Sequence, residues 1–146
     1  MRLRWLQPAD ADLIEVVEAL NAADFDEPMA FTPSSMSNFL VSNDRGYLVA
    51  YVDGELAGAV HGFLLWQPSG WKELFVYGVD VVKKHRRYGV AQAMMEEVLR
   101  IASDLGAGEV WVGTEADNAP AQGLYRKLGT KHEYGAVIFK YHPKER

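Results

Sequence analysis

The most specific signal in the sequence is the stretch Arg86-Arg87-Tyr88-Gly89-Val90-Ala91-Gln92. It is expected to join the end of a strand to the start of a helix. The small residues at positions 89 and 91 let the backbone come close to a ligand. The first N–H groups of a helix lack partners and carry partial positive charge. Because the two arginines add formal charge and paired donors, the stretch predicts a cradle for a pyrophosphate.

The same stretch also fits a solvated basic loop before a helix, since short glycine motifs are frequent by chance. The chain contains neither the Gly-Lys-Ser/Thr of a P-loop nor a G-x-G-x-x-G fingerprint. Nucleoside triphosphate hydrolysis and Rossmann-type dinucleotide binding are therefore disfavoured.

Strands are expected on both sides of the cradle, where β-branched and aromatic residues run between turn signals. They cover a short segment around Leu3 and Trp5, and residues 47–52, 55–66, 72–82, 110–114 and 136–141. Asp53-Gly54 supplies the type I′ turn of a hairpin. The strand at 110–114 follows a helical crossover, which favours parallel pairing.

Helices are expected where apolar residues recur at offsets of three and four. They cover residues 13–21, 34–41, 89–105 and 119–128. Asp12 with Glu15 resembles a capping box, and Asn118 is a favourable N-cap. The residues thus predict one mixed α/β (α+β) sheet wrapped by about four helices.

The chain of 146 residues has room for one domain with one sizeable core, so we expect a single domain over 1–146. Its net charge of −5 argues against nucleic acid or an anionic membrane as a partner and favours a cationic one. It has no cysteine, no apolar run of membrane-spanning length and no signal peptide at its start, so a cytoplasmic location is expected.

A second constellation lies about thirty residues after the cradle. Asn118, Ala121, Tyr125 and Gly129 recur at three and four residues and so share one helix face. A phenol on that face is able to donate a proton to a leaving group. The alternative is an ordinary half-buried tyrosine packed beside leucines.

Together the two motifs resemble the GNAT acyltransferase superfamily, which transfers acetyl groups from acetyl-CoA to amines. The R/Q-x-x-G-x-G/A loop of that family matches residues 86–91, and its Asn-x-x-Ala-x-x-x-Tyr helix matches residues 118–125. Residues 73–77, 85–91 and 124–130 look most like the aminoglycoside 3-N-acetyltransferases. Those enzymes have an aspartate directly after the tyrosine that Tyr77 matches, whereas this chain has Gly78 and then Asp80.

The resemblance implies a mixed, mostly antiparallel six- to seven-stranded sheet with a splayed central parallel strand pair. It implies acetyl-CoA as co-substrate, without a metal, and Tyr125 as the donor that protonates the departing thiolate. Strand backbone is expected to pair with the pantetheine arm, and loop amides with the pyrophosphate. The cofactor-binding set expected on this ground is Val79, Val81, Arg86, Arg87, Tyr88, Gly89, Val90, Ala91, Gln92, Asn118 and Ala121.

A general base is needed because an ammonium must lose a proton before its nitrogen attacks a thioester. Glu73 is the first candidate, at the spacing where ribosomal-protein N-terminal acetyltransferases of the superfamily keep a base glutamate, and Asp80 is the second. Asp26, Glu27 and Glu115 are candidates for an acidic opening that attracts a polycationic amine. The four histidines are dispersed without metal-ligand spacing.

The acceptor stays open at this stage. An aminoglycoside or another polycationic small molecule is one reading, and a peptide N-terminus, a lysine side chain or a metabolite amine is another. A non-catalytic acyl-CoA sensor would need the cradle but neither an acid nor a base. Homodimers formed through the final strands are common in such folds, and the resemblance extends that expectation to this chain.

Overall fold

The computed structural model describes residues 1–129 and 137–143, and over these residues the expected sheet has five strands in the order β1-β2-β3-β4-β5. The strands are β1 (Arg2–Trp5), β2 (Arg45–Val52), β3 (Glu55–Trp66), β4 (Lys72–Val81) and β5 (Glu109–Val112). The first three pairings are antiparallel and the β4–β5 pairing is parallel. The mixed, mostly antiparallel sheet is thus confirmed.

The expected strand count and the expected last strand need correction. The described residues form five strands rather than six to seven, and β5 is their edge strand, so its pair with β4 is not central. Residue 136 of the expected final strand lies outside the described residues, and residues 137–141 have no regular secondary structure. A pattern of apolar residues alone does not provide the neighbour that a strand needs.

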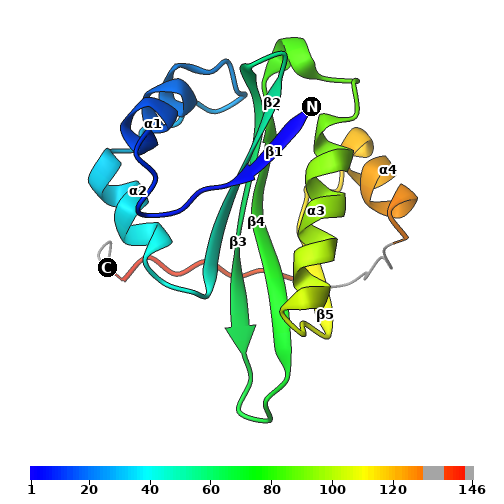
Figure 1. Cartoon of the computed structure of the whole chain (residues 1–146). Helices are drawn as coiled ribbons and strands as arrows, with labels where there is room; N and C mark the ends of the chain where they lie inside the picture. The colour runs from blue at the N-terminus through cyan, green and yellow to red at the C-terminus, as the bar shows by residue number, and fades with distance from the viewer. Residues whose placement is uncertain (130–136, 144–146) are drawn as a thin grey trace.

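Four α-helices cover the two faces of the sheet (Figure 1). They are α1 (Leu13–Ala22), α2 (Pro33–Leu40), α3 (Val90–Asp104) and α4 (Ala119–Lys127), with a short 3-10 helix η1 (Lys83–His85) before α3. In Figure 1 the pair α1 and α2 lies on one side of the sheet, and α3 and α4 lie on the other. All four lie within one or two residues of their predicted positions.

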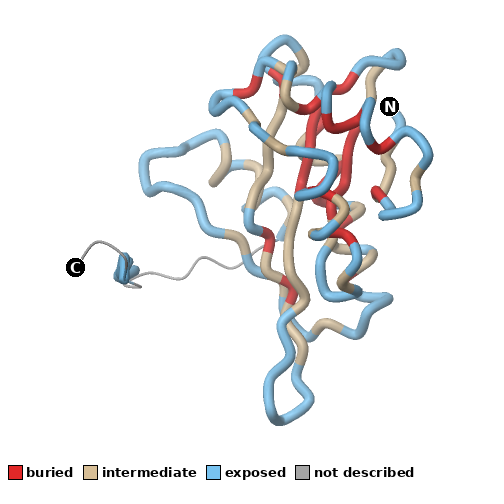
Figure 2. Tube along the Cα trace, turned by 90° about the vertical axis from the view of Figure 1, so that its left-hand side faces the viewer, coloured by how far each residue is buried: buried red, intermediate tan, exposed pale blue. Residues whose placement is uncertain are grey.

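The layers bury two separate apolar cores, seen as the red segments of Figure 2. Side chains of α1 and α2, such as Leu20 and Met36, pack in one core with Val49 from the sheet. On the opposite face, Met94 and Val98 of α3 pack in the second core. Because each face of β2, β3 and β4 is covered, the sheet holds its strand ends in fixed positions between the helices.

The expected capping box at Asp12 is not formed. The Asp12 carboxylate instead accepts two hydrogen bonds from the Arg4 guanidinium, at 2.8 and 2.6 Å, and this pairing lowers the pKa of Asp12. A capping box is present one helix later, where Thr32 and Ser35 exchange hydrogen bonds at the start of α2. A bidentate arginine thus takes the carboxylate away from the helix terminus.

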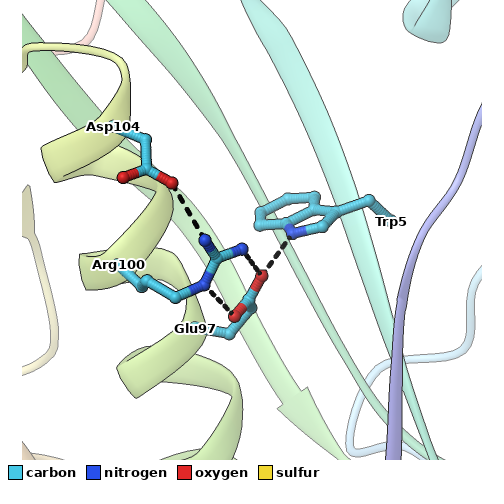
Figure 3. A network of polar contacts seen from close by, with 4 residues as sticks. All are labelled: Trp5, Glu97, Arg100 and Asp104. Carbon is cyan, nitrogen blue, oxygen red and sulfur yellow. Dashed lines mark hydrogen bonds and ion pairs between the residues drawn. The ribbon is translucent and has the colours of Figure 1, made fainter.

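A polar network ties the first strand to α3 (Figure 3). The Trp5 indole N–H donates to a Glu97 carboxylate oxygen at 3.0 Å. Arg100 donates to both oxygens of Glu97 and also to Asp104. These contacts hold the pKa of Glu97 at about 2, with the Arg100 hydrogen bonds as the largest cause.

One extra residue in β4 changes which side chains face which layer. Gly62 pairs with Val76 and His61 pairs with Gly78, so Tyr77 is a β-bulge on β4. Val79 then joins Val76 on the α3 face, where both belong to the second core. Asp80 therefore points to the opposite face, the one it shares with His61.

Candidate active site

A cleft of about 1000 Å³ opens where β4, β5, α3 and α4 meet. The parallel β4–β5 ladder ends at the pair Val76 and Val112, so residues 77–81 of β4 run on past the end of β5. The cleft lies at this divergence and is lined by residues 77–81 on one side and 112–114 on the other. The expected splay of the two parallel strands is therefore present at their carboxyl ends.

The predicted cradle forms one end of the cleft. Arg87 and Gly89 both adopt left-handed backbone conformations, with φ of 69° and 79°. These turns bring the loop directly to the start of α3, where buried Val90 anchors the helix to the core. A left-handed turn before a helix start presents backbone N–H groups to an anion. The loop thus has the geometry and charge that a pyrophosphate requires.

Helix α4 forms a second wall and carries Tyr125 into the cleft. The Asn118 side chain accepts a hydrogen bond from the Ala121 N–H at 3.2 Å, as expected of an N-cap. Gln122 also donates to the Ala116 carbonyl at 2.7 Å, which fixes the first turn. Burial raises the pKa of the Tyr125 phenol, and the nearby Asp80 charge adds to that effect. The phenol therefore remains protonated at neutral pH and is able to act as a proton donor.

One part of the cleft lining, the acidic end, carries carboxylates. Asp26 and Glu27, from the segment between α1 and α2, line it together with Asp80 of β4. Burial raises the pKa of Asp80, and the charges of Glu27 and then Asp26 raise it further. Asp26 also forms an ion pair with Arg86 at 2.9 Å, which links the acidic end to the cradle loop.

Most of the predicted site residues line this one cleft. They are Asp26, Glu27, Val79, Asp80, Val81, Arg86, Arg87, Gly89, Val90, Ala91, Gln92, Asn118, Ala121 and Tyr125. These residues come from four separate segments of the chain, so the fold brings together what the sequence spreads over about a hundred positions. Their assigned roles remain predictions.

Three predicted residues lie outside the lining of the cleft. Glu73 pairs with Leu65 and Asp80 with Ala59, so the two carboxylates are about 20 Å apart along the sheet at about 3.3 Å per residue of β3. Glu73 accepts a hydrogen bond from the Trp71 indole at 3.2 Å. Tyr88 is 76% exposed and is absent from the cleft lining. Glu115 is exposed, and it is its backbone carbonyl that accepts the Asn118 N–H.

Sequence reasoning missed His61 and Tyr77 as lining residues. His61 lies on β3 and reaches the cleft through its pairing with Gly78. Its ring stacks on Tyr47 at 5.6 Å between centroids and lies 5.4 Å from the Tyr77 ring. The sequence contained one indication of this position. Pairing the two strands outward from the turn at 67–70 brings His61 opposite Tyr77 in β4.

Two further features were sought among the described residues: a metal-binding cluster and a membrane-spanning helix. Over residues 1–129 and 137–143, histidine and carboxylate side chains do not gather in threes that would hold a metal ion. Among the described helices, none has both the length and the apolar character needed to cross a membrane.

Comparison with known proteins places the chain in a family. Residues 13–130 match the model of the acetyltransferase (GNAT) family, so the chain belongs to this family of acetyl-CoA-dependent acyltransferases. It is 28% identical over 138 residues to an N-alpha-acetyltransferase of Sulfurisphaera tokodaii, covering 89% of this chain and 80% of that protein. It is 30% identical over 89 residues to a streptothricin acetyltransferase of Streptomyces lavendulae, covering 60% of this chain and 45% of that protein. The chain thus spans less than half the length of this second relative.

Solved structures share the fold. An aminoglycoside acetyltransferase from an uncultured soil metagenomic sample superposes with a TM-score of 0.80 at 24% identity, covering 97% of this chain and 98% of that one. An aminoglycoside N-acetyltransferase in complex with CoA superposes with a TM-score of 0.71 at 16% identity, covering 97% and 99%. At these identities the likeness establishes the shared architecture, and the acceptor is argued from this chain's own cleft.

Proposed function

We propose that this protein transfers the acetyl group of acetyl-CoA directly to a primary amine of a polycationic small molecule, with an aminoglycoside as the leading class. The observation that supports this is the continuity of the cleft. A single space of about 1000 Å³ is lined both by the basic cradle loop and by the carboxylates of Asp26, Glu27 and Asp80. One site therefore offers side chains of opposite charge to an anionic cofactor and to a cationic acceptor.

The residues present fit acetyl-CoA. The amides from Arg87 to Gln92 would hold the pyrophosphate, and backbone groups near Val79 and Val81 would pair with the pantetheine arm. The thioester would then lie near the point where β4 and β5 diverge, beyond the pair Val76 and Val112. A strand amide near Val81 would stabilise the developing oxyanion of the tetrahedral intermediate.

The acidic end fits a cationic acceptor. Asp80 is half-buried. Its pKa is raised because burial, and then the charges of Glu27 and Asp26, disfavour the ionised carboxylate. A bound ammonium would offset these effects, because an opposite charge within a few ångströms favours the ionised carboxylate. Tyr125, on the facing helix, would then protonate the departing thiolate.

Release of CoA thiol from acetyl-CoA across a panel of amines tests the proposal. The panel contains aminoglycosides, polyamines, amino acids and short peptides, and the expected result is acceptor-dependent release that is fastest with polycations. Faster release with short peptides would favour N-terminal acetylation instead, the activity named for the archaeal relative that covers most of the chain. Tight acetyl-CoA binding with no release from any amine would overturn the proposal in favour of a sensor.

A further inference from the structure

His61 occupies an unusual place for a histidine that packs against an aromatic core. It is half-buried on β3, it lines the acidic end of the cleft, and it stacks on the buried Tyr47 ring. Phe39 and Phe63 meet its ring edge-on from two further sides. The imidazole is therefore held in one orientation by rings on three elements, with the cleft on its remaining side.

The space beside His61 exists because residue 78 is glycine. A Cβ at Gly78 would lie 2.8 Å from Cε1 and 3.1 Å from Nδ1 of His61, closer than a Cβ is able to approach. The same point lies 3.6 Å from Oδ2 of Asp80. A ring nitrogen and a carboxylate oxygen thus flank one position on β4 from which a side chain is excluded.

We propose that His61 is a catalytic residue, whose imidazole takes the proton from the acceptor's ammonium while Asp80 stabilises the imidazolium that forms. This inference rests on the proposed function and assigns its general base. Glu73, the first candidate from sequence, lies about 20 Å along the strand from Asp80. His61, Asp80 and Tyr125 of α4 line the same cleft, and Asp80 is near enough for its charge to raise the pKa of Tyr125.

The step balances as follows. The ammonium gives one proton to the imidazole, and its nitrogen attacks the thioester carbonyl carbon, forming the C–N bond. Collapse of the tetrahedral intermediate breaks the C–S bond. The thiolate takes the Tyr125 proton, and the amide nitrogen returns its surplus proton to the phenolate. The imidazolium releases its proton to water, so one proton leaves per acetyl group transferred.

The surroundings of His61 suit a base. Burial lowers the pKa of the imidazole, so the ring is neutral and able to accept a proton at pH 7. The rings of Tyr47 on β2 and Tyr77 on β4 lie against it, and the Asp80 carboxylate lies beside the same Gly78 position as the imidazole. Asp26 and Glu27, before α2, line the same cleft. The nearby Asp80 carboxylate would stabilise the imidazolium once it forms.

The test is the pH profile of kcat/KM for the best acceptor in wild type, His61→Phe and Asp80→Asn. His61→Phe keeps a stacking ring and removes the proton acceptor. We expect it to lose roughly 10²-fold or more in kcat and to lose the acidic limb of the profile. Asp80→Asn should retain that limb and shift it to lower pH, because the imidazolium loses its stabilising carboxylate.

Two controls separate catalysis from folding. His142→Asn alters an exposed histidine outside the cleft lining and should leave the profile unchanged. Acetyl-CoA binding and thermal unfolding of His61→Phe, measured by calorimetry, should match wild type. If that variant fails to fold, His61→Ala is used, and added imidazole should restore its turnover.

The outcomes are distinct. Wild-type turnover with an acidic limb that persists in His61→Phe would assign the base to Asp80 and overturn the inference alone. In His61→Ala, failure of imidazole to restore turnover would do the same. No wild-type turnover with any amine would overturn the proposed function and this inference with it.

Discussion

Tyr125 is the proposed proton donor, and a single substitution tests this role. Its phenol lines the cleft, and burial raises its pKa. We predict that Tyr125→Phe lowers kcat by roughly 10²-fold or more, because a phenylalanine ring fills the same space without a proton to donate. Stopped-flow or steady-state thiol release measures the loss. An unchanged kcat would remove Tyr125 from the mechanism.

A substitution at Gly78 tests how closely the His61 ring packs against β4. An added methyl group would come within 2.8 Å of the His61 ring, and the rings that pack around His61 restrict its movement. We predict that Gly78→Ala costs about 1–3 kcal/mol in unfolding free energy, as overpacking does in a well-filled site. Urea denaturation measures the cost. A variant as stable as wild type would show that His61 moves freely.

For single residues, two motifs in the sequence predicted two walls of the cleft, the cradle loop and one face of α4. The matches at 86–91 and 118–125 have fixed spacing on a helix start and a helix face, so local geometry is enough to place them. Glu73, predicted from spacing along a strand, lies outside the cleft lining, and its role as a base stays a prediction. His61 was missed because its partners come from other strands.

Among the elements, the loop before α3 carries the strongest backbone requirement. Gly89 has a φ of 79°, and its missing side chain would meet open space. We predict that Gly89→Ala costs about 1 kcal/mol in stability, since L-residues are strained in the left-handed region. Acetyl-CoA affinity should fall with it, as measured by calorimetry.

The matched control for Gly89 is Gly123, inside α4. It also has open space where a Cβ would lie, but no positive φ. Gly123→Ala should raise stability by up to about 1 kcal/mol, because alanine is favoured over glycine in a helix interior. Equal effects of the two substitutions would mean that φ is not the cause.

The network between β1 and α3 makes a prediction about pH. Removal of the carboxylate in Glu97→Ala leaves the Trp5 indole N–H without its acceptor and should cost about 1–2 kcal/mol. Because folding lowers the pKa of Glu97 from 4.5 to about 2, its contribution is complete above pH 4.5 and is lost as pH falls toward 2.

Unfolding measured at pH 7 and pH 3 tests this sign. The wild type and Glu97→Ala should differ most at pH 7 and less at pH 3. Asp104→Ala, which removes the exposed outer partner of Arg100, serves as control and should change stability less than Glu97→Ala does. A gap that widens on acidification would contradict the assignment.

Among the elements, periodicity placed α1, α3, β2 and β3 because each of them has a buried face, whereas α4 was placed by its N-cap and terminating glycine. The bulge at Tyr77 could not be predicted, since one extra residue leaves the apolar pattern of β4 intact. Counting back from the turn at 67–70 pairs His61 with Tyr77, and the bulge shifts that pair to Gly78. The final strand could not be judged from its own residues, because pairing depends on a neighbour.

Across the whole molecule, the negative charge should govern how the acceptor binds. The net charge is −5, and Glu27 at the acidic end is exposed. We predict that KM for a polycationic acceptor rises as salt is raised toward 0.15 M, more steeply than KM for a monoamine. Glu27→Gln should raise the polycation KM by up to about fivefold, consistent with an exposed ion pair. Equal salt dependence for both acceptors would argue against an acidic recognition end.

We propose that acetyl-CoA and the amine bind in one cleft and that the acetyl group passes directly between them. A reaction run with acetyl-CoA and the best acceptor, with CoA thiol and acetylated acceptor quantified together, tests this most directly. We predict equal amounts of the two products, an unacetylated protein, and the collapse of both products in Tyr125→Phe. Thiol release without acetylated acceptor, or a Tyr125→Phe variant as fast as wild type, would contradict the account.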